Sequence, residues 1–327
     1  MHNILCSITT YNRYDTTLPL VLAAVINQTL SPNKIIVYDD NQDPKDLRSN
    51  ELYRNLFQMM ELKGIKFEWV YALKKGQHHS HQMANTAGFK WVWRVDDDLV
   101  PEPTVLKELV RYIKDDVGAI AGATLTPAWG ITPRKSTGLI EKIYDEPNIQ
   151  WGMIDQIHEV DHLHCSFLYR AGVEDYNLAL SRKAHREETL FSYGLKKRGF
   201  RLLVVPDAVS WHLKFGQGGI RTPTLEDQQM YEHDERIFQS YIGLKDKTIV
   251  VLDNGMGDHL VARKVLKDIK NPVCFTCYPE IIPGRSIAEA YQMFGDLSQW
   301  NLYKWMDTHN WKGSMESAFR KMYGVEK

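Results

Sequence analysis

A chain of 327 residues can hold one large domain and a small one, and its formal net charge of -1 gives no basic surface for broad nucleic-acid binding. The sequence has no run of about eighteen apolar residues and enters an apolar segment near its start. We therefore expect a soluble, cytoplasmic protein with neither a membrane span nor a signal peptide. The four cysteines suit a reducing compartment. One Cys-x-x-Cys, Cys274 to Cys277, has no partner pair, so we do not expect structural zinc or redox chemistry.

Apolar runs predict the first four strands of the chain, at residues 3–13, 34–38, 65–71 and 91–95. Helical segments separate these strands. Two of them have apolar faces, made of Leu18, Leu22, Val25 and Ile26 and of Leu52, Leu56, Met59 and Met60. Strands that alternate with helices form a parallel α/β sheet, and such sheets bind ligands at the carboxyl ends of their strands.

Acidic residues follow two of these strands directly. Asp39 and Asp40 end the strand at 34–38, and three consecutive aspartates, Asp96 to Asp98, end the strand at 91–95. Adjacent carboxylates repel one another unless a cation lies among them, and hard oxygen ligands suit Mg²⁺ or Mn²⁺ together with substrate phosphates. A solvated acidic turn is the alternative. The two clusters together predict a nucleotide and metal pocket.

Two later acidic pairs are candidates for a catalytic base. Glu187 and Glu188 open a segment that reads as a helix and leads into a strand near residue 200. Glu174 and Asp175 follow Gly172 in a segment that reads as a surface turn.

These motifs resemble glycosyltransferase family 2, which has the GT-A fold. The likeness rests on Thr-Thr-Tyr-Asn-Arg at 9–13, Ile-Ile-Val-Tyr-Asp-Asp at 35–40, Val-Asp-Asp-Asp at 95–98 and the helix and strand over 186–202. Their order and spacing fit the family, and the resemblance covers roughly residues 3–220. It implies an inverting, metal-dependent transferase that moves a hexose-type sugar from a nucleotide donor, expected to be UDP, to an acceptor hydroxyl.

The resemblance also assigns roles to individual residues. Glu188 matches the general base, although this chain has Glu-Glu where the family commonly has Glu-Asp. Asp98 matches the ligand of Mn²⁺ or Mg²⁺, and His212 a further metal or phosphate contact. The donor nucleotide is expected to contact Thr9, Tyr11, Arg13, Asp39, Asp40, Asp96, Asp97 and Arg221. The structural alternatives are a plain strand residue for Thr9, helix capping for Asp39 and Asp40, and a hydrogen-bonded histidine beside Trp211 for His212.

Several further segments carry weaker expectations. The helix over 77–85 matches the family's donor-lining helix, which would let His81 or Asn85 contact the donor. Residues 125–165, with Trp129 and Trp151, are expected to shape the acceptor site. The glycine-rich segment 215–221 is expected to close over the donor as a lid. His162 and His164 would face the same side of a strand, a spacing that suits a metal, although hydrogen-bonded histidines are the favoured interpretation.

The last part of the chain begins a new pattern. A strand at 248–252 runs into Gly-Met-Gly-Asp-His-Leu at 255–260 and a helix through Leu266. This resembles the opening of GT-B-type enzymes such as heptosyltransferases, but without the full Gly-x-Gly-x-x-Gly pattern. We expect a GT-A catalytic domain over 1–244 and a small Rossmann-like α/β appendage over 245–327. The appendage is expected either to form a homo-oligomer or to bind the acceptor. An apolar face is expected from Trp300, Tyr303, Trp305, Trp311 and Phe319.

Two other classes of function compete with the transferase. A nucleotidyltransferase would share the sheet and the metal carboxylates, but normally shows a phosphate loop rich in glycine and lysine after its first strand, which residues 9–13 do not offer. A catalytically inactive nucleotide-sugar-binding module would keep the pocket without the reaction. The acceptor stays open among a glycan, a lipid-linked saccharide, a protein side chain and a modified nucleic-acid base.

Overall fold

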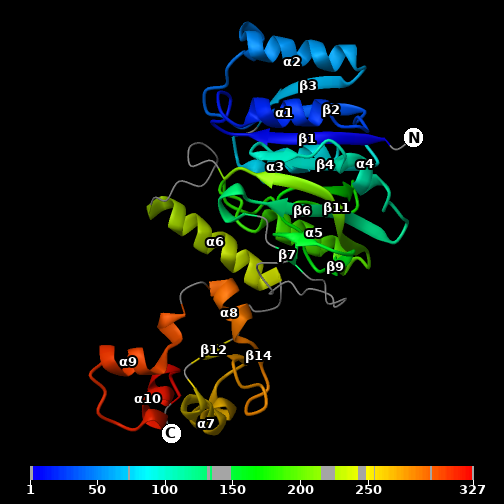
Figure 1. Ribbon diagram of the computed structural model, residues 1–327. Helices are drawn as coiled ribbons and strands as arrows, with labels where there is room; N and C mark the ends of the chain where they lie inside the picture. The colour runs from blue at the N-terminus through cyan, green and yellow to red at the C-terminus, as the bar shows by residue number, and fades with distance from the viewer. Residues whose placement is uncertain are drawn as a thin grey trace. The chain divides into compact units, whose positions relative to one another are not determined.

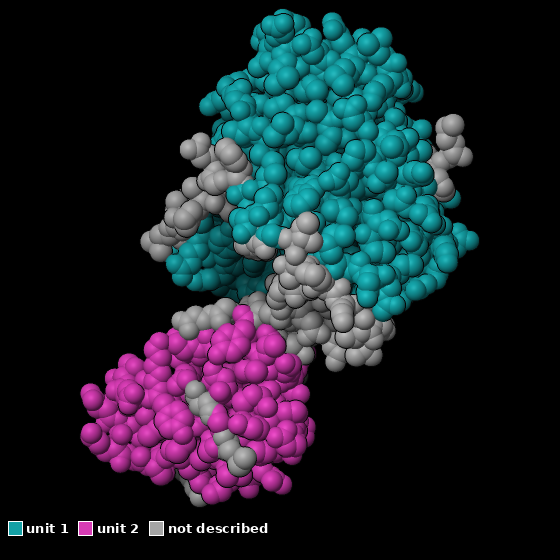
Figure 2. All heavy atoms as spheres, in the orientation of Figure 1, with its two compact units in different colours: residues 1–143, 147–238 teal, residues 144–146, 239–327 magenta. Residues whose placement is uncertain are grey.

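The computed structural model describes residues 3–72, 74–130, 133–134, 149–214, 225–241, 248–253, 255–294 and 297–325. The chain divides into two compact units, a first of residues 1–143 with 147–238 and a second of residues 144–146 with 239–327 (Figure 2). Each unit has its own buried apolar core. Among the described residues, no helix is both long and apolar enough to cross a membrane.

The first half of unit 1 is a parallel sheet in the order β3-β2-β1-β4 (Figure 1). Its strands are β1 (Ile4–Thr10), β2 (Lys34–Asp39), β3 (Lys66–Tyr71) and β4 (Trp91–Asp96). The predicted parallel α/β arrangement is confirmed here. The third strand begins one residue later than predicted because the Ile65 amide closes the end of the preceding helix, donating to the Met60 carbonyl at 2.9 Å.

The sheet continues in a mixed order, β4-β10-β6-β11-β5. Its added strands are β5 (Leu99–Pro101), β6 (Val117–Leu125), β9 (His158–Val160), β10 (Phe167–Arg170) and β11 (Arg201–His212). Strand β10 runs antiparallel to both neighbours, and β5 and β9 pair antiparallel with β11. A short two-stranded sheet joins β7 (Pro133–Arg134) and β8 (Met153–Ile154). The alternation of strands and helices in the sequence did not indicate these antiparallel pairings, which join distant segments.

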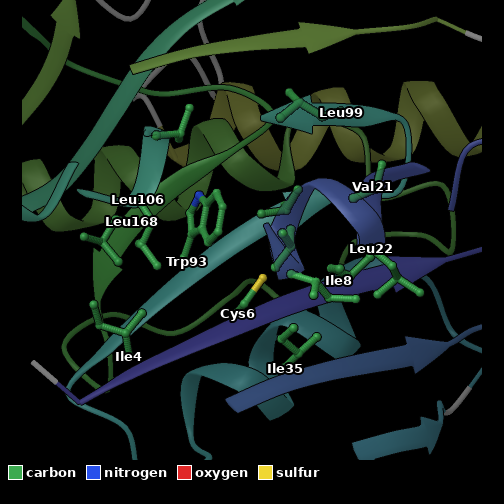
Figure 3. Packing of buried hydrophobic residues seen from close by; sticks show 14 of the residues in the cluster. Ile4, Cys6, Ile8, Val21, Leu22, Ile35, Trp93, Leu99, Leu106 and Leu168 are labelled. Atoms are coloured by element: carbon green, nitrogen blue, oxygen red, sulfur yellow. The ribbon is translucent and has the colours of Figure 1, made fainter. Parts of the chain in front are cut away.

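The helices of unit 1 include α1 (Leu18–Ile26), α2 (Glu51–Leu62), α3 (Gln77–Asn85), α4 (Val105–Val110), α5 (Glu187–Lys197) and α6 (Leu225–Tyr241), with short 3-10 turns η1 (Leu47–Ser49) and η2 (Pro127–Trp129). Of these, α1, α2 and α4 cover one face of this sheet, and α3 and α5 cover the other. Successive strand residues point to opposite faces. Cys6, Ile8 and Trp93 therefore face the core with α1, α2 and α4, where Figure 3 shows them beside Val21 and Leu22 of α1. The alternate residues pack with α3 and α5.

A bulge in β11 brings this strand to the ligand edge of the sheet. The pairing of β11 with β6 shifts between Val205 and Val209. At Gly122 of β6 a Cβ atom would overlap the carbonyl of Ala208, so only glycine fits against the bulge. Beyond it, β11 continues until His212 pairs with Leu99 of β5, next to the aspartate cluster.

Unit 2 is a small α/β unit of its own. Its parallel sheet has the order β12 (Thr248–Leu252), β13 (Pro272–Thr276) and β14 (Arg285–Ser286). Its helices are α7 (Met256–Val265), α8 (Ile287–Phe294), α9 (Leu302–Thr308) and α10 (Met315–Met322), with 3-10 turns η3 (Leu266–Asp268) and η4 (Ser298–Trp300). The predicted strand, glycine turn and helix are present. Phe319 is buried in this core, with Trp305 and Trp311 packed against it.

Candidate active site

The carboxyl ends of β1, β2 and β4 meet at one edge of the sheet. Thr9 pairs with Asp96 of β4, and Thr10 pairs with Asp39 of β2. The Asp40 amide then donates to the Thr10 carbonyl at 3.0 Å. Parallel pairing thus gathers both acidic clusters beside the first strand, as the sequence pattern predicted.

Asp97 and Asp98 follow the same strand but contact different parts of the molecule. Asp97 accepts hydrogen bonds from the Thr10 hydroxyl at 2.8 Å and the Tyr11 amide at 3.2 Å, and its other oxygen lies 3.5 Å from Arg13 Nε. Burial raises the pKa of Asp97 to about 7, against the opposing charge of Arg13. These contacts hold the loop after β1. Asp97 was expected to bind the donor nucleotide directly, and its contacts in the structure are to the protein.

Asp98 lies between a histidine and an arginine. Its Oδ1 is 3.3 Å from His212 Nε2, and its Oδ2 is 2.7 Å from Arg13 Nη1. The backbone holds Asp98 close to His212, because the Leu213 amide donates to the Asp98 carbonyl at 2.9 Å beside the β5–β11 pairing. Burial raises the pKa of Asp98, but His212 and Arg13 outweigh it and hold that pKa below its ordinary value.

The Asp98 and His212 pair has the chemistry of a divalent cation site that shares its metal with a substrate. A carboxylate oxygen and an imidazole nitrogen suit Mn²⁺ or Mg²⁺, which take their remaining ligands from phosphates and water. Within the described part of the chain, no group of three or more His, Cys, Asp and Glu side chains has the geometry to hold a metal alone. Asp98 and His212 could therefore supply two ligands to a metal whose other ligands come from a diphosphate and water.

Asp39 and Asp40 also differ in surroundings. Asp39 accepts hydrogen bonds from the Tyr14 hydroxyl, from Asn41 Nδ2 at 2.7 Å and from Trp69 Nε1 at 3.2 Å, so it organises the loops around it. Asp40 faces the start of α3, where the Gly76 amide donates to it at 3.2 Å. Burial raises the pKa of Asp40 to about 6, although nearby backbone amides oppose the shift.

The acidic pair at the start of α5 is divided between the interior and the site. Glu187 is fully buried and forms a two-pronged ion pair with Arg94 of β4, with contacts of 2.9 and 3.0 Å. Gln77 Nε2 donates to Glu187 at 3.1 Å. Glu188 instead has a side chain 13 % exposed, with Oε1 3.8 Å from His164 Nδ1. Of the pair, Glu188 is the carboxylate with an exposed part to its side chain.

Arg94 is a site residue that the sequence reading missed. It is 1 % exposed in the middle of an apolar strand, and its guanidinium also lies 3.2 Å from Asp96. Burial lowers its pKa, but Glu187 and its other partners raise that pKa well above the ordinary value, while burial raises the pKa of Glu187 and Arg94 opposes that rise. A single charged residue within an apolar strand, between Trp93 and Val95, was the feature of the sequence that could have indicated a buried ion pair.

The upstream acidic pair has other partners. Glu174 forms an ion pair with Arg198, and Asp175 accepts a hydrogen bond from Gln82 Nε2 at 2.7 Å. These contacts join the turn after β10 to α3 and to the end of α5.

The loop before Glu187 is held by α6. The buried Asp234 carboxylate accepts hydrogen bonds from the Ser181 amide at 2.6 Å, the Ser181 hydroxyl at 2.8 Å and the His185 amide at 2.9 Å. Lys183 Nζ lies 2.7 Å from Asp227 of the same helix. The loop contains two non-glycine residues with positive φ, Ala184 at +49° and Arg186 at +66°, conformations that need such support.

His162 and His164 do not lie on a strand, so the strand spacing considered for a metal does not apply to them. They fall in the irregular segment between β9 and β10, where their rings meet edge to face at 4.9 Å. Burial, together with the nearby His164, lowers the pKa of His162 well below its ordinary value.

The two residues expected from α3 lie in the interior. His81 is buried with its ring stacked on Tyr176 at 5.4 Å. Asn85 donates to the Glu174 carbonyl at 2.8 Å and accepts from the Gly172 amide at 2.9 Å. Two other expectations, Arg221 and the glycine-rich segment 215–221, lie outside the described residues.

This sheet, with acidic residues after β2 and β4 and a carboxylate at the start of α5, has the architecture of the GT-A glycosyltransferases. The sequence profile of Glycosyl transferase family 2 matches residues 6–176, more than half of the 327-residue chain. The chain belongs to this family and is a glycosyltransferase. This assignment replaces the nucleotidyltransferase alternative.

Two solved structures, both of S. aureus TarS, agree with this fold. The crystal structure of S. aureus TarS 1-349 in complex with UDP-GlcNAc matches with a TM-score of 0.52 and 14 % identity, over 98 % of this chain and 84 % of that one. S. aureus TarS matches with a TM-score of 0.50 and 15 % identity, and there this chain spans about half of the other's length, 50 % against 98 % of its own. GalNAc-T7 with UDP, GalNAc and Mn²⁺ has a TM-score of 0.49 and 13 % identity, over 95 % and 58 %. No curated protein matches the chain by sequence.

Proposed function

We propose that this chain is an inverting, metal-dependent glycosyltransferase that moves a hexose-type sugar from a UDP donor to an acceptor hydroxyl. The observation that carries the proposal is the meeting of Asp98 with His212 at 3.3 Å, at the same sheet edge as Thr9 and Asp96. A family 2 glycosyltransferase needs a site for the donor diphosphate, and this pair supplies metal ligands where parallel strands bind nucleotides.

The nucleotide would lie over the ends of β1 and β2. Thr9 Oγ1 is buried and has no hydrogen-bond partner among the described residues, so a donor group on the nucleotide would satisfy it. Asp40 adds a carboxylate beside the Gly76 amide, and Asp96 at the end of β4 would reach the ribose. The uracil nucleotide is chosen because the TarS structure of similar fold holds UDP-GlcNAc.

A bound Mn²⁺ or Mg²⁺ would be held by Asp98 and His212 and would offset the charge that develops on the leaving diphosphate. Arg13, now 2.7 Å from Asp98 Oδ2, keeps that carboxylate ionised and oriented. Asp97, through Thr10 and Tyr11, fixes the loop on which Arg13 lies.

Glu188 would act as the general base. Its carboxylate removes the proton of the acceptor hydroxyl while that oxygen forms a bond to the anomeric carbon. The bond from the anomeric carbon to the phosphate oxygen breaks in the same step, and its electron pair leaves with UDP. One displacement of this kind inverts the anomeric centre. Glu188 lies in the first turn of α5, at the helix end whose dipole complements a carboxylate.

Calorimetric titration of UDP tests the donor site. Binding should require Mn²⁺ or Mg²⁺, disappear with EDTA and weaken at least about tenfold in Asp98→Ala. Asp115→Asn, an exposed aspartate just before β6, is the matched control and should bind as wild type does. Metal-independent UDP binding, or equal binding by Asp98→Ala, would contradict the metal assignment.

A further inference from the structure

The indole of Trp151 is surrounded by three basic side chains from other segments. Its ring centre lies 6.2 Å from that of His164 and 5.7 Å from that of His212. The ammonium of Lys214, just beyond β11, lies 5.3 Å from the indole centre.

These contacts place Trp151 between the two chemical ends of the site. On one side His212 lies 3.3 Å from Asp98, the expected metal ligand. On the other side His164 lies 3.8 Å from Glu188, the expected base. In a single displacement, the anomeric carbon lies between the leaving diphosphate and the attacking hydroxyl, which the base contacts. The transferred sugar must therefore span the same interval as the indole.

The backbone holds Trp151 in this place. Gln150 is fully buried, with Nε2 donating to the His164 carbonyl at 2.7 Å and Oε1 accepting from the His164 amide at 3.0 Å. The Gln150 carbonyl accepts from the Thr124 amide of β6 at 2.7 Å. Trp151 itself is partly buried and packs against the apolar core of unit 1, while the contacts of Gln150 fix the backbone beside it. A fixed, partly exposed aromatic face suits the C–H face of a sugar ring.

We propose that Trp151 is a contact for the transferred sugar of the donor, with His164 and His212 setting its orientation. This inference rests on the proposed function, because it takes the metal at Asp98 and the base at Glu188 as the two ends of the reacting group. It assigns to one residue the part of donor affinity that comes from the sugar rather than from the nucleotide.

The test compares UDP with UDP-sugars in Mn²⁺ by calorimetry, using UDP-Glc, UDP-Gal, UDP-GlcNAc and UDP-GalNAc and keeping the sugar that wild type binds best. Trp151→Ala should weaken that UDP-sugar about tenfold, while its affinity for UDP stays within about twofold. Trp151→Phe retains a flat aromatic face and should lie between wild type and Trp151→Ala. Thermal unfolding of each variant shows whether the site is still folded, and Trp151→Leu replaces Trp151→Ala if the smaller side chain destabilises the loop.

Two results overturn the inference. If Trp151→Ala lowers the affinities for UDP and for the UDP-sugar equally, Trp151 only supports His212. If both affinities are unchanged, Trp151 contacts neither the sugar nor the nucleotide. If wild type binds no UDP at all with Mn²⁺, the proposed function itself fails and the inference fails with it. If wild type binds UDP but the variants show no selective loss of affinity for the UDP-sugar, the role of Trp151 is contradicted and the proposed function is not.

Discussion

Glu187 and Glu188 are adjacent in sequence but differ in environment. Glu187 is fully buried against Arg94, whereas Glu188 reaches the side of the site near His164. We expect Glu187→Gln to destabilise the protein by about 3–5 kcal/mol, because it removes the buried carboxylate that pairs with Arg94 and leaves only Asp96, at 3.2 Å, to balance that charge. Urea unfolding of Glu187→Gln and of the double variant Arg94→Met with Glu187→Met measures this. The double variant should recover most of the loss, and a double variant as unstable as the single one would contradict the ion-pair account.

Asp40 predicts a pH dependence of stability. Its pKa in the folded protein is raised to about 6, above its ordinary value, so the folded state holds this proton more tightly than the unfolded chain does. The resulting stability is complete at low pH and is lost as pH rises to about 6. The free energy of unfolding of wild type, relative to Asp40→Asn, should therefore fall by roughly 2–3 kcal/mol between about pH 4 and pH 6.5. Urea titrations at several pH values test this, and parallel curves for the two proteins would contradict it.

At the scale of elements, α6 supports the loop that carries the base. Asp234→Ala removes three buried hydrogen bonds to Ser181 and His185, and should cost about 2–4 kcal/mol of stability. It should also lower turnover more than UDP affinity, because the loop leads to Glu188 and not to the nucleotide. Glu232→Gln, an exposed change on the same helix, is the control and should alter neither quantity. A loss of UDP affinity equal to the loss of turnover would show that α6 supports the whole site.

Local patterns in the sequence predicted the elements that depend on local periodicity. Strands β1 to β4, the acidic ends of β2 and β4, and the helix at Glu187 were all readable from the residues. The features that the sequence did not predict depend on long-range contacts. The bulge that brings His212 to Asp98 arises from the approach of Ala208 to Gly122, and the inward turn of Asp97 arises from Thr10. Neither feature can be predicted from the spacing of residues within one segment.

At the scale of the whole molecule, each unit should unfold around its own core. Phe319 is 1 % exposed in unit 2, and Phe319→Ala should cost that unit about 3–5 kcal/mol. The residues of the proposed donor site lie in unit 1, so UDP with Mn²⁺ should raise only the unfolding transition of unit 1. Differential scanning calorimetry of wild type and Phe319→Ala, with and without UDP and Mn²⁺, tests this. Loss of UDP binding in Phe319→Ala would contradict it.

Unit 2 begins earlier in the chain than the sequence pattern predicted. Its boundary in the structure, after Phe238, falls within α6, whereas the sequence pattern favoured residue 244. Oligomerisation or acceptor binding by residues 245–327 stays a prediction. Light scattering of the full chain measures the first, and a monomer would leave acceptor binding as the proposed role.

The most direct test of the proposed function is UDP release from the panel of UDP-sugars with Mn²⁺, comparing wild type with Glu188→Gln. Wild type should release UDP slowly by donor hydrolysis and lose this activity in EDTA. Glu188→Gln should lose at least about 100-fold in rate while binding UDP as tightly as wild type does, because a general base contributes to the reaction and not to donor affinity. Equal rates for wild type and Glu188→Gln, or turnover that survives EDTA, would contradict the proposed mechanism.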